Sequence, residues 1–244
     1  MLVKLKIKYI QTLGQKKFRE QEGLFIAEGP KLVAELLEPG IAVVKEIFAL
    51  EEWIHEQKNI PSTTTVTAVS EKELERISQL STPNKVLAIV EQFKIKKPLE
   101  TKGKISLVLD NIQDPGNLGT ILRIADWFGI EQVICSPGTA DLYNSKVVQA
   151  TMGSIARVNV VYTGLAAWLN EQKNIPVYAA SLEGKDISAL KKITEGIILI
   201  GNESKGISDE IMELATTKIT IPRKGRAESL NAAVAAGIIL SHIH

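Results

Sequence analysis

The chain has 244 residues, a formal net charge of +1 and a 45% share of hydrophobic residues, so it can build one large or two small domains with an ample core. Lysines near the N-terminus alternate with apolar residues and no long apolar run follows, so we expect a cytoplasmic protein with no secretory signal and no membrane span. The single cysteine, Cys135, excludes an intrachain disulfide and a cysteine metal cluster, and the near-neutral charge means that any nucleic-acid contact must come from local clusters of cations.

The first part of the chain predicts a small α/β sandwich over residues 1–92. Its expected elements are a lysine-rich helix from about residue 5 to Glu20, strands at Leu24–Ala27, Val43–Leu50, Thr63–Val69 and Val86–Val90, a helix at Pro30–Leu37 and a helix capped by Ser70. Residues 93–104 are polar and lysine-rich and contain Pro98, which is typical of a linker. Lys94, Lys96 and Lys97 fit a solvated linker better than an RNA contact.

Strands and helices alternate over residues 105–244, which predicts a parallel α/β sheet. The expected strands are Ile105–Asp110, Gln132–Cys135, Val158–Val161, Val177–Ala180, Ile197–Ile200 and Lys218–Ile221, and several are continuous apolar runs, as in strands buried on both faces. Ligands bind such sheets at the carboxyl ends of the strands. The segments that follow the strand ends are therefore the candidates for a site.

The segment Leu109–Phe128 (LDNIQDPGNLGTILRIADWF) runs from a strand through a polar loop into a helix. Asp114 is a natural N-cap, and Pro115 suits the first helical position. The helical spacing predicts a buried stripe of Leu118, Ile121, Leu122 and Ala125, and a different face of Gly116, Gly119, Thr120 and Arg123. Small residues that lead to one arginine favour a site where an RNA backbone approaches. Trp127 and Phe128 are expected to pack rather than to stack on bases.

Two further segments follow strand ends, Leu199–Gly206 (LIGNESKG) and Ile221–Ala236 (IPRKGRAESLNAAVAA), and neither is a dinucleotide-binding G-x-G-x-x-G or a P-loop. Gly201 would let a ligand approach the backbone. The loop from Pro222 to Glu228 carries three cations. Ser229 is a natural N-cap for a last helix from Leu230 to about His242, which is apolar nearly all round and therefore expected to be buried.

These three segments, in this order and spacing, resemble the motifs of the SpoU (TrmH-like) RNA ribose 2′-O-methyltransferases of the SPOUT superfamily, over residues 105–242. The segment Phe25–Val33 (FIAEGPKLV) is similar to the small RNA-binding N-terminal domain of that family. The resemblance implies a trefoil knot in the C-terminal domain and S-adenosylmethionine (AdoMet) as methyl donor, with no metal. It also implies a homodimer and a structured RNA as partner, ribosomal RNA rather than transfer RNA, and no DNA.

The resemblance also assigns residues to roles. Catalytic positions are Asn117, Arg123, Glu203, Ser229 and Asn231, and cofactor-binding positions are Leu199, Gly201, Ile221, Ser229 and Leu230. The cations Arg223, Lys224 and Arg226 lie in a motif loop beside this site, which favours contacts with RNA phosphates over a merely solvated charge run. Two departures are present: Arg223 stands where the family often has Met, and Ala232-Ala233 stands where it often has Val-Ser. Neither change removes a catalytic group that the resemblance implies, although Arg223 bears on RNA contacts.

Each of these residues has a structural alternative. Arg123 could snorkel from a half-exposed helix, Asn117 could cap a loop, and Ser229 and Asn231 could cap the last helix. Glu203 could pair with Arg123 or be solvated.

As a catalytic group, Arg123 is either a general base or a charged clamp on phosphate and the 2′-oxygen. Because free arginine has a pKa of about 12.5–13.8, holding it neutral at pH 7 would cost roughly 7–9 kcal/mol. This cost favours the clamp.

The sequence therefore predicts an enzyme that methylates a ribose 2′-hydroxyl in RNA with AdoMet, an activity that distinguishes RNA from DNA. An alternative is a non-catalytic RNA-binding or ribosome-assembly factor that retains the fold. A third hypothesis is a small-molecule-binding α/β protein with no RNA role.

Overall fold

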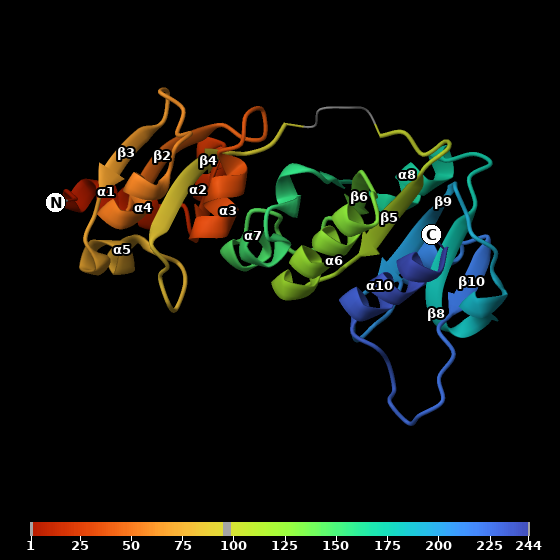
Figure 1. The fold of residues 1–244 in the computed structure, drawn as a ribbon. Coiled ribbons are helices and arrows are strands. Elements are labelled where there is room, and N and C mark those ends of the chain that lie inside the picture. Colours follow the sequence, from red (N-terminus) through yellow and green to blue (C-terminus); the bar gives the residue numbers. More distant parts are fainter. Residues whose placement is uncertain (1, 95–98, 244) are drawn as a thin grey trace. The chain divides into compact units, whose positions relative to one another are not determined.

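The computed structural model describes residues 2–94 and 99–243, so Lys96, Lys97 and Pro98 of the predicted linker lie outside the described residues. The chain divides into two compact units, residues 1–94 with 143–156 and residues 95–142 with 157–244. Figure 1 shows the helices and strands of each unit. The segment Tyr143–Ala156 groups with the first unit although it follows residue 105 in the chain.

The first unit contains a four-stranded sheet in the order β1-β4-β2-β3, in which β2 and β3 are parallel and β4 is antiparallel to both β1 and β2. Its elements are α1 (Lys4–Thr12), α2 (Lys16–Glu22), β1 (Leu24–Glu28), α3 (Pro30–Leu36), β2 (Val44–Ala49), α4 (Glu51–Glu56), β3 (Thr65–Ala68), α5 (Glu71–Ile77), β4 (Val86–Glu91), α7 (Ser145–Thr151) and the 3-10 turn η1 (Ser154–Ala156). The expected α/β sandwich is thus present, with each predicted strand displaced by at most two residues at either end.

The predicted N-terminal helix is wrong in one respect, because it is two helices. The chain turns at residues 13–15, and the buried Arg19 of α2 donates from one guanidinium nitrogen to the carbonyl oxygens of Leu13 (2.9 Å) and Gly14 (2.8 Å). These carbonyls follow the end of α1, where helical partners are missing. The arginine satisfies them and so stabilises the break.

The second unit contains a six-stranded sheet in the order β10-β8-β9-β5-β6-β7, and every neighbouring pair is parallel. Its elements are β5 (Ile105–Asp110), α6 (Pro115–Trp127), β6 (Gln132–Cys135), β7 (Asn159–Tyr162), α8 (Leu165–Glu171), β8 (Val177–Asp186), the 3-10 turn η2 (Ile187–Ala189), β9 (Gly196–Gly201), α9 (Asp209–Met212), β10 (Thr217–Thr220) and α10 (Ala232–Ile243). The prediction of a parallel α/β sheet is confirmed, and β5 and β6 have the predicted bounds.

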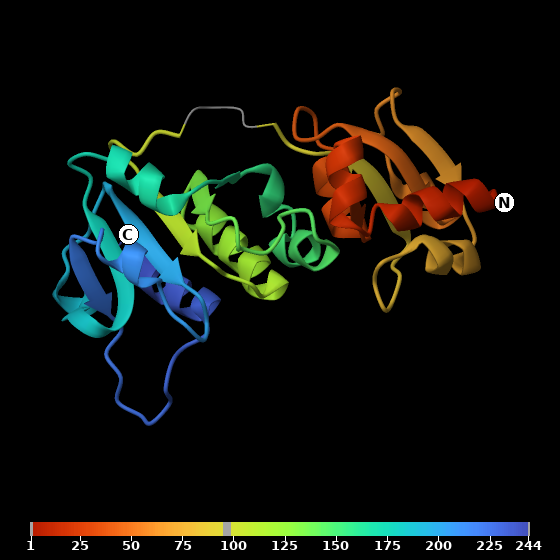
Figure 2. The ribbon, with the colours of Figure 1, turned by 180° about the vertical axis from the view of Figure 1, so that it is seen from behind.

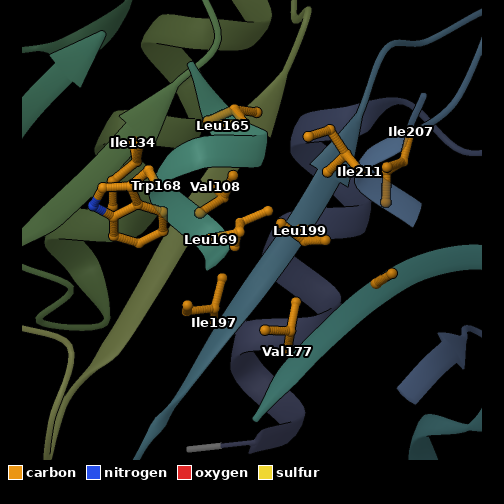
Figure 3. Close-up of a cluster of buried hydrophobic side chains, with 11 residues drawn as sticks. Val108, Ile134, Leu165, Trp168, Leu169, Val177, Ile197, Leu199, Ile207 and Ile211 are labelled. Carbon is orange, nitrogen blue, oxygen red and sulfur yellow. The ribbon is translucent and has the colours of Figure 1, made fainter. Parts of the chain in front are cut away.

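Helices cover both faces of this sheet. On one face the buried side chains of β5, β6, β8 and β9 pack against α8 and α9 through Leu165, Trp168, Leu169 and Ile211 (Figure 3). On the other face α6 and α10 pack against each other, and α10 also contacts β9; Figures 1 and 2 show these two helices from opposite sides. Side chains alternate between faces along a strand, so β5, which is buried throughout, and β9, which is buried over its first five residues, can supply both cores.

The last helix is only partly buried, which corrects the prediction of a helix buried all round. Ala233, Ala236 and Leu240 face the core, whereas Val234 and Ile238 are 50% and 38% exposed. The sheet and α6 cover one side of α10. The other side remains an open apolar surface.

Candidate active site

The three motif segments meet through one asparagine. Asn117 donates from Nδ2 to Oε1 of Glu203 at 2.6 Å, and its Oδ1 accepts a hydrogen bond from Nδ2 of Asn231 at 2.7 Å. These partners lie 86 and 114 residues away in the sequence. The network therefore joins α6, the loop after β9 and the start of α10.

Helix α6 positions Asn117 by its own N-cap. The Asp114 side chain accepts from the backbone N–H of Asn117 at 2.7 Å, and Pro115 occupies the first turn, as predicted. The predicted apolar stripe of α6 is confirmed, since Leu118, Ile121, Leu122 and Ala125 are fully buried. Gly119, which the helical spacing places on the side of Arg123, is also buried, so that face is open at Thr120 and Arg123 and covered at Gly119.

The loop after β9 is a compact turn that presents Glu203. Asn202 and Gly206 exchange two backbone hydrogen bonds of 2.9 Å, and the Asn202 side chain accepts from the N–H groups of Ser204 (2.9 Å) and Lys205 (3.1 Å). Its Nδ2 donates to the carbonyl oxygen of Asn111 at 2.8 Å, which ties the turn to the segment after β5. Asn202 therefore fixes the loop while Glu203 carries the polar contact to Asn117.

Asp110 is a structural residue of the site that the sequence did not single out. It is 3% exposed, and its Oδ2 accepts from the backbone N–H (2.8 Å) and the hydroxyl (2.7 Å) of Ser208, while Oδ1 accepts from Nδ2 of Asn111. A carboxylate directly at the end of a fully buried strand is the signal that could have identified it. Asp110 joins the chain after β5 to the chain after β9.

Gly201 is required by the protein's own backbone. A Cβ atom at this position would lie 2.3 Å from the carbonyl carbon of Gly206 and 2.3 Å from the amide nitrogen of Ile207. The returning chain therefore fills the space on the side-chain side of this glycine, and the approach of a ligand to the Gly201 backbone stays a prediction. The glycine still shapes the turn that holds Glu203.

The segment that joins β10 to α10 is open to solvent. Ile221 is partly buried, and the side chains from Pro222 to Asn231 are exposed, including the three predicted phosphate contacts, Arg223, Lys224 and Arg226. Asn231, not Ser229, caps α10, because its Oδ1 accepts from the N–H groups of Ala233 (2.9 Å) and Val234 (3.2 Å). Ser229 lies two residues before this cap and is exposed.

Arg123 lies on α6 with its side chain exposed, six residues after Asn117. Within the described part of the chain it has no ion-pair or hydrogen-bond partner, and Glu203 contacts Asn117 instead. The predicted alternative that Glu203 pairs with Arg123 is therefore wrong for this conformation. The guanidinium remains available to an external anion.

The predicted cofactor positions differ in their surroundings. Leu199 is fully buried in β9 between Val108 of β5 and Ala179 of β8, so its side chain belongs to the core. Leu230 is 46% exposed on the segment before α10. Leu182, in a bulge of β8, is 71% exposed, and its carbonyl oxygen accepts from the Thr220 hydroxyl at 3.2 Å. Leu230 and Leu182 are thus exposed apolar side chains, and the sequence motifs did not indicate Leu182.

Two cavities in the second unit lie away from this network. One, of about 420 Å³, lies at the amino ends of the strands. Most of its lining residues precede or begin strands of the sheet and include Lys104, Gln132 and Thr194. The other, of about 400 Å³, lies along the open side of α10 beside Ile238 and His242. Across residues 2–94 and 99–243 no cluster of His, Cys, Asp and Glu is arranged to hold a metal ion. No helix within those ranges has the length and apolar character needed to cross a membrane.

Two protein families and several known proteins are similar to this chain. The SpoU rRNA methylase family model matches residues 104–241, and the MRM3-like substrate-binding domain model matches residues 4–88. The 23S rRNA (guanosine(2553)-2′-O)-methyltransferase RlmP of Bacillus subtilis is 34% identical, over 98% of this chain and 95% of that protein.

Two solved structures are similar over almost the whole chain. The AdoMet-bound rRNA methyltransferase of Sinorhizobium meliloti has a TM-score of 0.86 and 32% identity, covering 100% of this chain and 95% of that one. The SpoU methyltransferase AviRb of Streptomyces viridochromogenes, in complex with AdoMet, has a TM-score of 0.82 and 25% identity, covering 98% and 96%.

The chain belongs to the SpoU rRNA methylase family. It is an AdoMet-dependent RNA 2′-O-methyltransferase, as the sequence predicted. Its methyltransferase domain has the SPOUT fold and follows a substrate-binding domain. The roles of individual residues and the trefoil knot stay predictions.

Proposed function

We propose that this protein methylates the ribose 2′-hydroxyl of one nucleotide in ribosomal RNA, and that the RNA is 23S rRNA. Support for this RNA comes from the relative of 34% identity, which aligns over 95% of its own length and is named for guanosine 2553 of 23S rRNA. In this proposal residues 1–92 bind the RNA, residues 93–104 link the two domains and residues 105–244 catalyse methyl transfer. Transfer RNA is the alternative substrate.

The network of Asn117, Glu203 and Asn231 carries the proposal for the active site. Its two hydrogen bonds orient the Asn117 amide, leaving one Nδ2 hydrogen and the second Glu203 oxygen to contact a ligand. A donor and an acceptor held side by side suit the neighbouring hydroxyls of a ribose. We propose that this pair positions the target sugar and that Ser229, on the exposed segment before Asn231, completes the polar lining.

Arg123 acts in this proposal as a charged clamp. Its exposed guanidinium can bind a phosphate bidentately and stabilise negative charge as it develops on the 2′-oxygen. AdoMet would be held near Gly201, Ile221, Leu230 and Leu182, with Leu199 supporting the strand beneath, and would supply the methyl group of its sulfonium. The proton of the 2′-hydroxyl would pass to a water molecule or to the RNA phosphate. The protein contributes mainly the in-line alignment of the 2′-oxygen with that methyl group.

The open side of α10 supports a homodimer. Val234 and Ile238 expose apolar surface on α10, the helix that Asn231 caps. A second copy that covers this surface would lie next to the Asn117 network. We propose that two copies associate there, so that each active site lies beside the interface.

The test is transfer of labelled methyl from AdoMet into unmodified 23S, 16S and transfer RNA. Wild-type protein should label one RNA as a 2′-O-methyl nucleotide, with 23S expected. Arg123→Ala and Asn117→Ala should each lower kcat by about 100-fold or more, which corresponds to a barrier higher by roughly 2.7 kcal/mol. Both variants should still bind AdoMet. Asn170→Ala is the matched control, because Asn170 is an exposed helical asparagine on α8 whose side chain donates to the carbonyl oxygen of Ala166 in its own helix.

Two outcomes would contradict the proposal. RNA and AdoMet binding without methyl transfer to any of the three RNAs would support the non-catalytic RNA-binding factor. Full activity of Arg123→Ala would remove the clamp and leave the asparagine network as the only support for the site. Arg123→Lys separates charge from geometry, since lysine keeps the charge but not the bidentate fork.

A further inference from the structure

Trp127, at the end of α6, is exposed in a way that packing does not explain. Its side chain is 84% exposed, whereas Trp53 and Trp168 are 1% and 9% exposed. The expectation that Trp127 packs within the chain is therefore wrong. A flat aromatic ring that stands in solvent on a well-formed helix is available to a partner.

The position of Trp127 relates it to the proposed site. Thr120, Arg123 and Trp127 follow one another at intervals of three and four residues, so they share the open face of α6. Trp127 lies one turn beyond Arg123, about 6 Å further along the helix axis. A nucleic-acid strand whose phosphate is held by Arg123 would bring a neighbouring base to the indole.

The charges around the ring favour a polyanion over an apolar partner. The adjacent Asp126 is engaged by Arg157, whose Nε and second guanidinium nitrogen contact its carboxylate at 2.9 Å and 2.7 Å. That pair is neutral overall, and Arg123 adds an exposed positive charge on the same face of α6 as Trp127. Aromatic rings beside cations are the elements with which proteins bind unpaired bases.

We propose that Trp127 stacks on an unpaired base of the RNA substrate, next to the nucleotide whose phosphate Arg123 clamps. This inference rests on the proposed function and extends it to a substrate class, namely a target nucleotide in a loop or bulge with an unstacked neighbour. A stack of one base on an aromatic ring changes affinity by about 5- to 150-fold. Trp127 is thus a positioning residue for the RNA and has no contact with the methyl group.

The experiment combines kinetics with tryptophan fluorescence, using unmodified 23S rRNA transcript as the probe. Trp127→Ala should raise the KM for RNA by about tenfold and leave kcat within about twofold, while Trp127→Phe retains most of the affinity. RNA should quench the wild-type fluorescence and protect it from iodide, because Trp53 and Trp168 are already shielded. Both effects should be absent in Trp127→Phe.

The outcomes distinguish this inference from the proposed function. If wild type methylates the transcript and Trp127→Ala has the same KM, stacking is refuted and the function stands. If the wild-type protein methylates no RNA, the proposed function is refuted. Fluorescence quenching by RNA that depends on Trp127 then still decides whether an RNA base stacks on this residue. Protection from iodide that grows with protein concentration in the absence of RNA would overturn the inference and identify an interface between protein copies.

Discussion

Gly201 lies where two segments of backbone come into contact. The end of β9 and the Gly206-Ile207 peptide approach so closely that only a hydrogen fits on the α-carbon. The turn between them carries Glu203 to Asn117. The close backbone packing that this glycine allows therefore decides whether Glu203 is presented to Asn117.

Gly201→Ala should therefore destabilise the second unit rather than simply displace a ligand. A Cβ at 2.3 Å from backbone atoms forces the turn to move, which we expect to lower the free energy of unfolding by about 1–3 kcal/mol. Urea unfolding followed by circular dichroism measures this. Gly225→Ala is the matched control, because a Cβ at Gly225 has no atom within 4 Å. Wild-type stability with lost AdoMet binding would instead mean that the space at Gly201 serves the cofactor.

Among the elements, α5 shows how a short helix is stabilised at its start. Ser70 and Glu73 form a reciprocal capping box, and Glu73 also accepts from the backbone N–H of Leu2. Hydrogen bonds from the backbone N–H groups of Ser70 and Leu2 lower the pKa of the Glu73 carboxyl to about 2. Only the ionised carboxylate makes all of these contacts as an acceptor.

This shift predicts a pH-dependent stability. Because the folded pKa lies below the unfolded value, the carboxylate stabilises the fold at neutral pH, and that contribution is lost as pH falls from about 4.5 through about 2. Glu73→Gln should be less stable than wild type at pH 7 and equally stable near pH 2, as measured by urea unfolding at several pH values. The control Glu75→Gln, on the exposed side of the same helix, should match wild type throughout. A difference between Glu73→Gln and wild type that is constant with pH would refute the assignment.

The segment between β10 and α10 presents its cations to solvent, and within it Arg223 donates to the carbonyl oxygen of Ala227 at 3.1 Å. If Lys224 and Arg226 each contact a phosphate, the double variant Lys224→Ala/Arg226→Ala should reduce the slope of log K against log salt by about 1.4–1.8. Filter binding of the 23S transcript over a salt series gives that slope. The control variant Lys191→Ala/Lys192→Ala removes the same charge from another exposed segment and should leave the slope unchanged. Equal slopes for the two double variants would refute the phosphate contacts.

At the scale of the whole molecule, the open side of α10 predicts self-association. Val234→Lys/Ile238→Lys should halve the mass measured by analytical ultracentrifugation while preserving the unfolding transition, because both side chains already face solvent. Leu5→Lys is the control, since Leu5 is 81% exposed on α1 and belongs to the other unit. A wild-type protein that sediments as a monomer at micromolar concentration would remove the homodimer from the proposal.

Much of the architecture follows from local pattern. Continuous apolar runs predicted β5 and β6 with their observed bounds, and the helical spacing of α6 predicted four fully buried residues and the Asp114 cap. Local pattern did not predict the break between α1 and α2, because the break depends on Arg19, whose side chain reaches back over the turn. Nor did it predict the exposed side of α10, because hydrophobicity indicates what a helix can bury and not what covers it.

The sequence by itself determined the fold class, the order of strands and helices along the chain, the family and the candidate residues of the site. Propensity, capping and hydrophobic period act over a few residues, so they can be recognised in one segment at a time. Tertiary structure alone decided that Glu203 contacts Asn117 and not Arg123, that Asn231 caps α10 while bonding Asn117, and that Gly201 serves the backbone. These contacts join residues far apart in the chain, and their geometry depends on strand order and loop path, which no local pattern specifies.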